Sequence, residues 1–410
     1  MFLNRERANR LMERDGIDAL VATTPENVYY LSDYGNQHTF HFGPWGLTAA
    51  ILPLDESIPP TLIAADWELP HLQERPSWMP GLEVQSSFMP FIPDTSSLSE
   101  AEKGLVEMWE QGAETGLPNR SRLIARTLEQ LGLSGSRLLF DDARVAFELK
   151  EQELGGAHVE QDPNFFREVR LVKTPDEIEM LRTAARKNEA ALIATASMVE
   201  EGVTTGQILN HYLATMGALG GYGSHMTGGG RERTWHTYPD PNYRLKKGDI
   251  YNMDPAGHFR YYWADMGRAA EVGRPSEKFQ HLYGTLQEIM TGASRLLEAG
   301  RSTADAKAET YRLAADAMPS GLTPLVHSIG IEQYDHPQSL GEFLSEDFDL
   351  EEGMVVNYEI PYFEFPWGVL QLEDTFLITA AGPERLQTLP QEPFYAPLAP
   401  SAPTAQTTAA

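Results

Sequence analysis

The chain contains no cysteine among its 410 residues. Disulfides, thiolate metal sites and cysteine nucleophiles are therefore excluded, and any metal or catalytic site has to use oxygen and imidazole groups. Long apolar runs are also missing, since no stretch approaches the roughly 18 consecutive apolar residues of a membrane-spanning helix. The first seven residues, MFLNRER, are charged and lack the apolar run of a signal peptide, so we expect a cytoplasmic location.

Basic residues are scarce as well. The sequence has 32 Lys and Arg against 59 Asp and Glu, which gives a formal net charge of −27. Nucleic acids and anionic membranes bind basic protein surfaces, so we expect neither as a partner. A hydrophobic content of 41% with 22% charged residues is typical of a globular protein. A chain of this length suits two domains better than one small core.

The first part of the chain alternates between helix and strand patterns. Residues 4–15 predict a helix that stops at Gly16, and residues 18–22 predict a strand. Thr24 with the following proline then caps a short helix. Further strands are expected at residues 49–54, 61–65 and 137–140. This order indicates an α/β domain.

The second part begins with a strong helix signal. Thr174 can cap a helix whose first turn carries Pro175 and Glu177, so that a capping box starts a long helix there. Beyond residue 248, strand and helix patterns follow one another, which indicates an α+β domain. We expect strands at 249–255, 259–272, 354–363 and 368–379, and helices at 276–298 and 303–317.

These patterns predict the limits of the domains. We expect an α/β domain over residues 1–165 and an α+β domain over residues 166–385. The last stretch, residues 386–410, is rich in Pro, Ala, Thr and Gln and has few apolar anchors. It is therefore expected to form a disordered tail.

Five side chains of metal-ligand type stand in short segments that are typical of strands or strand ends. They are Asp254, Asp265, His327, Glu359 and Glu373. Four carboxylates and one imidazole suit two divalent cations that share a water, which becomes a hydroxide nucleophile near neutral pH. Without cations they would form a costly cluster of like charge beside apolar strands. A set so rich in oxygen favours Mn²⁺, with Zn²⁺ or Co²⁺ as alternatives.

The order and spacing of these segments resemble the creatinase-fold metallopeptidases, the family of methionine aminopeptidase, aminopeptidase P and prolidase. The family places ten residues between its first two Asp ligands, as this chain does between Asp254 and Asp265. His327 opens a segment close to the family's His-Gly-x-Gly-Leu, and Gly368 to Asp374 match its Gly-x-x-x-x-Glu-Asp. The resemblance implies an α/β N-terminal domain, a catalytic domain of the "pita-bread" fold, short peptide substrates of the Xaa-Pro type and a homodimer.

The resemblance also implies roles for single residues. Asp254 would bind one metal, while Asp265 and Glu373 would bridge both. Glu359 would serve as a ligand and as the acid–base catalyst that passes a proton to the leaving amine. His236, on the glycine-rich loop that begins at residue 228, would contact the substrate carbonyl or the tetrahedral intermediate.

The chain departs from the family at positions that concern the substrate. A gap-free comparison from the His ligand puts Tyr334 where the family has a second His, and His336 follows two residues later. Either residue can take that role as a hydrogen-bond donor. Gln371 stands where the family has an Arg. In place of that Arg, the side chains of Arg231 and Arg233 on the glycine-rich loop can bind a substrate carboxylate.

Three functions stay open at this point. The first is a dinuclear-metal hydrolase of short peptides, acting as a dipeptidase, an aminopeptidase or a carboxypeptidase. The second is a hydrolase or lyase of a small non-peptide molecule on the same fold, which the departures at Tyr334 and Gln371 keep open. The third, a binding protein on a non-catalytic scaffold, is disfavoured because all five ligand residues are present.

Overall fold

The structure is a computed structural model that describes residues 1–35, 47–85, 90–92, 94–115, 119–151, 156–227, 240–338 and 347–395. Its chain divides into two compact units, Met1–Arg170 and Leu171–Ala410. None of the helices in these ranges combines the length and the apolarity that a membrane crossing requires. The unit boundary lies after the last helix of the first unit rather than after residue 165.

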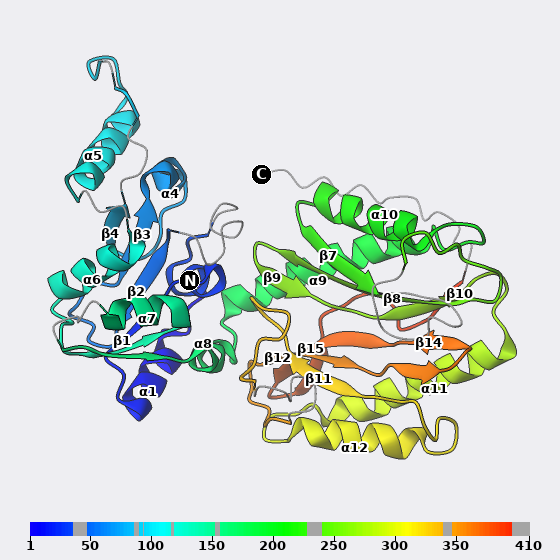
Figure 1. The fold of residues 1–410 in the computed structure, drawn as a ribbon. Helices are drawn as coiled ribbons and strands as arrows, with labels where there is room; N and C mark the ends of the chain where they lie inside the picture. The colour runs from blue at the N-terminus through cyan, green and yellow to red at the C-terminus, as the bar shows by residue number, and fades with distance from the viewer. Residues whose placement is uncertain are drawn as a thin grey trace. The chain divides into compact units, whose positions relative to one another are not determined.

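A six-stranded mixed sheet forms the first unit (Figure 1). Its strands are β1 (Ala19–Ala22), β2 (Ala49–Pro53), β3 (Thr61–Ala65), β4 (Gly81–Gln85), β5 (Arg137–Phe140) and β6 (His158–Gln161). They lie in the order β4-β3-β2-β1-β5-β6, with β1 antiparallel to β2 and parallel to β5. Strands β1, β2 and β3 are buried along their whole length, which explains their continuous runs of small and branched apolar residues.

Helices connect and cover this sheet. They are α1 (Arg5–Asp15), α2 (Pro25–Ser32), the short 3-10 helix η2 (Asp66–Glu68), α4 (Leu69–Glu74), α5 (Glu100–Thr115), α6 (Arg120–Gln130), α7 (Ala143–Glu151) and α8 (Pro163–Arg170). Helix α1 begins where the side chain of Asn4 accepts a hydrogen bond from the backbone N–H of Arg7, and it ends at Gly16 with a φ of 66°. The predicted α/β architecture of this unit is confirmed.

The second unit contains two main sheets and a hairpin. Its strands are β7 (Tyr222–Thr227), β8 (Ile250–Phe259), β9 (Tyr262–Ala264), β10 (Arg268–Glu271), β11 (Leu325–Ser328), β12 (Val355–Glu359), β13 (Tyr362–Glu364), β14 (Gly368–Leu370), β15 (Glu373–Thr379), β16 (Gly382–Arg385) and β17 (Phe394–Tyr395). One sheet has the order β17-β10-β8-β7, with β9 paired to β8. The other has the order β11-β12-β15-β16, and β13 pairs with β14.

Two layers of helices enclose these sheets. The helices are α9 (Pro175–Ala196), α10 (Thr205–Ala218), α11 (Glu277–Ala293), the 3-10 helix η4 (Ser294–Leu296) and α12 (Thr303–Ala314). Figure 1 shows α9 and α10 beside the sheet of β7 and β8, and α11 and α12 below the sheet of β11, β12 and β15. Two apolar cores fill the two helix–sheet layers. The expected α+β architecture is confirmed.

Some element boundaries differ from the predictions. The strand expected at 259–272 consists of β9 and β10, separated by Asp265 to Gly267, and the strand expected at 368–379 consists of β14 and β15. In both cases the chain leaves the sheet next to a predicted ligand. The capping box at Thr174 and Glu177 starts α9 as predicted.

The prediction of a disordered tail over residues 386–410 is wrong for its first part. Leu386 and Phe394 are buried, and β17 pairs in parallel with β10. Residues 396–410 lie outside the described ranges. The segment is polar in composition, but hydrogen bonds to buried carboxylates hold it, and composition does not reveal such partners.

Candidate metal centre

One face of the sheet formed by β11, β12 and β15 carries a group of polar side chains. Glu359 lies opposite Glu373 in β15 and opposite Leu325, two residues from His327, in β11. Because side chains alternate between faces along a strand, Glu359, Glu373 and His327 share one face. Residues in alternation with them, such as Val356, belong to the apolar core on the other face. The period of two therefore directs three predicted ligands into the space between the sheets.

The other two predicted ligands come from the facing sheet. Asp254 is in β8, and Asp265 lies in the short connection between β9 and β10. Gly267 joins the two sheets, because its backbone N–H and carbonyl form 3.2 Å hydrogen bonds with the backbone of Glu373. A Cβ at Gly267 would lie 2.8 Å from a carboxylate oxygen of Glu373, so this close approach requires glycine.

The five side chains meet in one place. The ligand atoms of Asp265, His327 and Glu373 all lie within 4.8 Å of one another. The carboxyl group of Asp254 is within hydrogen-bond reach of those of Asp265 and Glu373. The Oε1 atom of Glu359 lies 3.9 Å from Nε2 of His327. The roles of these residues as metal ligands stay a prediction.

Electrostatics make this cluster unfavourable without a cation. Burial, followed by the charges of neighbouring carboxylates, raises the pKa values of Asp265 and Glu373 well above their usual range. Burial lowers the pKa of His327 to about 4, so its ring is neutral at pH 7, the form that binds metals. A divalent cation would offset the repulsion among the carboxylates.

Two buried polar atoms in the cluster are consistent with metal ligation. Oδ1 of Asp265 and Nε2 of His327 are shielded from solvent and make no hydrogen bond within the part of the chain that the structure describes. A buried polar atom in this state costs about 1–3 kcal/mol. The donor set, with one imidazole nitrogen among carboxylate oxygens, fits a divalent cation. The residues present therefore fit the metal centre that the sequence predicts.

Three amide side chains support the carboxylates, and sequence reasoning did not assign them. Nε2 of Gln371 donates to Glu373 at 2.7 Å and to Glu359 at 3.1 Å. Asn357 also donates to Glu373, and Gln333 donates to Asp265 at 2.6 Å. Asn357 lies two residues before Glu359 in β12, so strand alternation would have found it.

The structure separates the two candidates for the family's second His. The ring of Tyr334 lies 4.4 Å from that of His327, and burial together with the nearby carboxylates raises the pKa of its hydroxyl. The ring of His336 stacks on Phe348 at 4.9 Å, and its Nδ1 accepts a 3.4 Å hydrogen bond from the backbone of Ser328. Tyr334 therefore lies beside His327 and near the carboxylates, whereas His336 contacts Ser328 and Phe348.

The remaining predicted substrate residues lie on the glycine-rich loop. This loop, with His236, Arg231 and Arg233, lies outside the described ranges. The described part of β7 ends at Thr227, which pairs with Asp254. The chain therefore enters the loop beside a predicted ligand, and the roles of the three residues stay predictions.

The C-terminal segment contacts the surroundings of the centre through Gln387. The side-chain amide of Gln387 accepts a 2.8 Å hydrogen bond from the backbone N–H of Thr375 and donates a 3.1 Å bond to the backbone carbonyl of Asp265. Thr375 in turn donates to the side chain of Asn357 at 3.0 Å, and Asn357 donates to Glu373. A buried polar chain thus runs from this segment to two predicted ligands.

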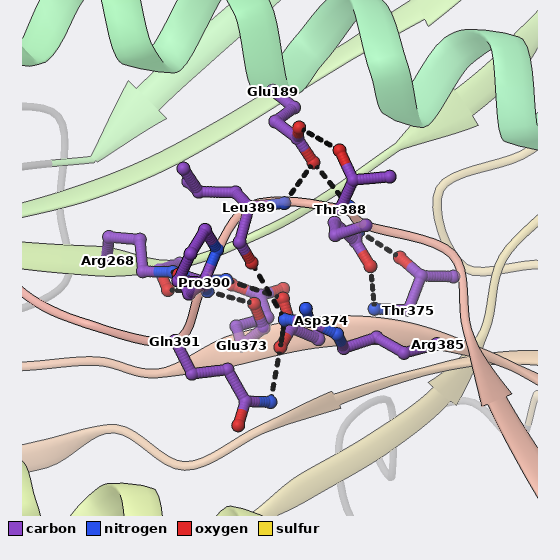
Figure 2. Close-up of polar contacts among 12 residues, drawn as sticks. Glu189, Arg268, Glu373, Asp374, Thr375, Arg385, Thr388, Leu389, Pro390 and Gln391 are labelled. Carbon is purple, nitrogen blue, oxygen red and sulfur yellow. Dashed lines mark hydrogen bonds and ion pairs between the residues drawn. The ribbon is translucent and has the colours of Figure 1, made fainter.

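Buried carboxylates anchor the segment itself, as Figure 2 shows. Glu189 accepts hydrogen bonds of 2.7 and 2.9 Å from the backbone N–H groups of Thr388 and Leu389. Asp374 accepts a 2.6 Å hydrogen bond from the side chain of Gln391. Asp374 is also in a buried ion pair of 2.8 Å with Arg268. These contacts explain why the segment packs against the second unit.

Comparisons with known proteins identify relatives of both units. The model of metallopeptidase family M24 matches residues 179–380, and the model of the creatinase/prolidase N-terminal domain matches residues 4–75. Together they match well over half of the chain. An Xaa-Pro dipeptidase of Pyrococcus furiosus is 24% identical over 281 residues, which cover 66% of this chain and 76% of that protein.

Solved structures share the fold along nearly the whole chain. An Xaa-Pro dipeptidase from Bacillus anthracis superposes with a TM-score of 0.73 at 19% identity, covering 95% of this chain and 98% of that chain. An X-Pro aminopeptidase from Thermotoga maritima also gives a TM-score of 0.73, at 17% identity, covering 96% and 99%. At this level of identity the likeness shows the fold, in both units.

Proposed function

We propose that the chain, a metal-dependent peptidase of the creatinase-fold metallopeptidase family, hydrolyses short peptides of the Xaa-Pro type with two divalent cations. The proposed ligands are Asp254, Asp265, His327, Glu359 and Glu373. The observation that carries the proposal is the meeting of these buried side chains, with Oδ1 of Asp265 and Nε2 of His327 left for a ligand. The relatives named Xaa-Pro dipeptidase support the substrate class.

The residues of the chain have separate roles in this proposal. Two divalent cations, when bound, would lower the pKa of a shared water and polarise the scissile carbonyl. Glu359 takes the proton of the attacking water and delivers it to the leaving amine, and the amide of Gln371 orients its carboxylate. Tyr334 donates a hydrogen bond to the substrate from its place beside His327. His236 stabilises the oxyanion.

The cation is proposed to be Mn²⁺, because four of the five proposed ligands are carboxylates and hard oxygen ligands suit that ion. Zn²⁺ and Co²⁺ are the alternatives. We also propose a homodimer in the cytoplasm. Light scattering of the purified protein tests the dimer, and cell fractionation tests the location.

A panel of substrates tests the function. Xaa-Pro dipeptides, Xaa-Pro-Yaa tripeptides and N-blocked peptides are incubated with protein freed of metal and then supplied with Mn²⁺, Co²⁺ or Zn²⁺. We expect metal-dependent cleavage of free Xaa-Pro dipeptides. Cleavage of N-blocked peptides from their C-terminal end would instead support a carboxypeptidase and the proposed clamp by Arg231 and Arg233.

A second candidate function is favoured by Tyr334, a phenol where the family has an imidazole. A phenol beside the centre suits hydrolysis or elimination on a small non-peptide molecule. Complete lack of cleavage across the panel, with stoichiometric binding of Mn²⁺, would reject the peptide proposal and favour this candidate. Cleavage of any panel peptide at an ordinary enzymatic rate would reject this second candidate function.

A further inference from the structure

A fully buried ion pair lies close to the candidate metal centre but is not part of it. Nζ of Lys173 is 2.7 Å from Oδ2 of Asp335, and neither side chain is exposed to solvent. Lys173 precedes helix α9, and its backbone N–H donates a 2.9 Å hydrogen bond to the carbonyl of Gly353. The lysine is therefore held on a fixed part of the second unit, and its ammonium group reaches the turn that follows β11.

That turn, residues 329–335, is built around the ion pair. The backbone N–H of Asp335 donates a 2.9 Å hydrogen bond to the carbonyl of Ser328, which closes the turn onto the end of β11. The carbonyl of Gly330 accepts a 2.8 Å hydrogen bond from the backbone of Trp263. A Cβ at Gly330 would collide with the carboxylate of Asp335 and the ammonium of Lys173. The turn thus leaves room for these two charged groups and for little else.

The same turn carries side chains to the carboxylate cluster. Gln333 donates a 2.6 Å hydrogen bond to Oδ2 of Asp265. Tyr334 places its ring 4.4 Å from that of His327. Asp335, the next residue, is held by Lys173. The ion pair therefore acts on the backbone directly beside Tyr334.

Stability alone is a weak reason for such a pair. Removing two charges from water costs several kcal/mol per ion, and a neutral pair of similar volume is often as stable or more stable. We propose that the Lys173–Asp335 ion pair is a positioning device that holds the turn 329–335 so that Tyr334 faces the metal centre. This inference rests on the proposed function, because that function assigns Tyr334 to the substrate.

The test neutralises both partners at once. In K173M/D335N the two side chains keep roughly their volumes and leave no uncompensated buried charge, whereas either single change would leave one. We expect the melting temperature and the bound Mn²⁺ of this variant to stay near those of the unmodified protein. The kcat/KM for the best Xaa-Pro dipeptide should fall about 10–100-fold, the usual effect of losing a residue that orients a functional group.

Two further measurements separate positioning from a merely structural role. Y334F should lower kcat/KM in the unmodified protein and add little in the K173M/D335N background, because Tyr334 is already misplaced there. Hydrogen–deuterium exchange should be faster over residues 329–338 of the double variant, since a turn that the ion pair no longer holds opens the hydrogen bond from the N–H of residue 335 to the carbonyl of Ser328 more often. The matched control R182M/E384Q removes a partly exposed ion pair of 2.6 Å in the same unit and should change none of these quantities.

Each contrary result has a distinct meaning. Full turnover in K173M/D335N, unchanged exchange over 329–338, or strictly additive effects with Y334F would overturn the inference. Loss of Mn²⁺ from the double variant would also overturn it, because the pair would then support the ligands rather than Tyr334. If the unmodified protein cleaves no panel peptide, the proposed function fails, and the exchange measurement still decides whether the pair holds the turn.

Discussion

Glu373 connects the two sheets of the second unit at the candidate metal centre. Its backbone pairs with that of Gly267, its carboxylate accepts hydrogen bonds from Asn357 and Gln371, and the carboxyl group of Asp254 is within reach. Because burial and neighbouring charge raise its pKa so strongly, the ionised form needs a cation nearby. Glu373 is therefore the residue at which metal binding is most directly tested.

We predict that Glu373→Ala abolishes metal-dependent activity and removes most of the bound metal, because a bridging carboxylate would serve both ions. Metal analysis of the purified variant, together with kinetics, measures this. The matched control is Glu384→Ala, which changes a partly exposed Glu in the neighbouring strand β16. A Glu373→Ala protein that retains two equivalents of metal would contradict the bridging role.

A second residue-scale prediction concerns Glu177, which is buried in the capping box of α9. Burial raises its pKa to about 8 from the usual 4.5. The folded protein therefore keeps a proton that the unfolded chain releases, so this stabilising contribution is complete below about pH 4.5 and is lost as the pH rises to about 8. Glu177→Gln keeps the capping geometry and removes the titration.

We expect the melting temperature of the unmodified protein, relative to Glu177→Gln, to fall steadily from about pH 5 to about pH 8. Thermal unfolding at four pH values in this interval measures the difference. A difference that is constant with pH would mean that the folded-state pKa of Glu177 is close to that of the unfolded chain.

At the scale of elements, the C-terminal segment from Leu386 to Tyr395 belongs to the folded unit and reaches the candidate metal centre through Gln387. It lies beyond residue 380, where the match to the metallopeptidase family model ends. Its effect on the centre is indirect, because it contacts the backbone of Asp265 and the neighbours of Glu373 rather than the ligand atoms.

We predict that truncation after Arg385 weakens metal binding about 10-fold or more and lowers the melting temperature, because groups that orient ligands typically contribute 10–100-fold. Truncation after Tyr395 leaves the contacts of Gln387, Thr388 and Gln391 in place and serves as the control. Calorimetric titration with Mn²⁺ compares the two proteins. Equal affinities would show that the segment does not affect the ligands.

At the scale of the whole molecule, the formal charge of −27 opposes compaction, and part of that charge is gathered in one buried cluster. Monovalent salt screens exposed charges but hardly affects buried ones. A divalent cation that binds only the folded state stabilises it through mass action, by about 2.7 kcal/mol at a hundredfold excess over Kd.

We therefore expect NaCl to raise the melting temperatures of the unmodified protein and of Glu373→Ala alike, whereas Mn²⁺ should raise only the former by several degrees. Differential scanning calorimetry at fixed ionic strength separates the two effects. An equal response of both proteins to Mn²⁺ would place the stabilising cation on the surface rather than in the cluster.

Local sequence patterns determined much of this protein. The glycine that ends α1, the capping box that starts α9 and the strand patterns of the first unit depend on neighbours in sequence, so they predict helices, strands and two fold classes directly. The ligand-type residues stand out because each follows or interrupts an apolar strand, although their roles as ligands stay a prediction.

Only the tertiary structure decided which distant groups contact the five ligand-type residues or hold the segments beside them. Gln333 and the pair of Lys173 with Asp335 act across long sequence separations, and nothing in their local sequence reveals a partner. The ordering of residues 386–395 has the same origin, since Glu189 lies about two hundred residues away from the backbone that it holds. Composition describes how polar a segment is. Which buried groups form hydrogen bonds with it depends on the fold.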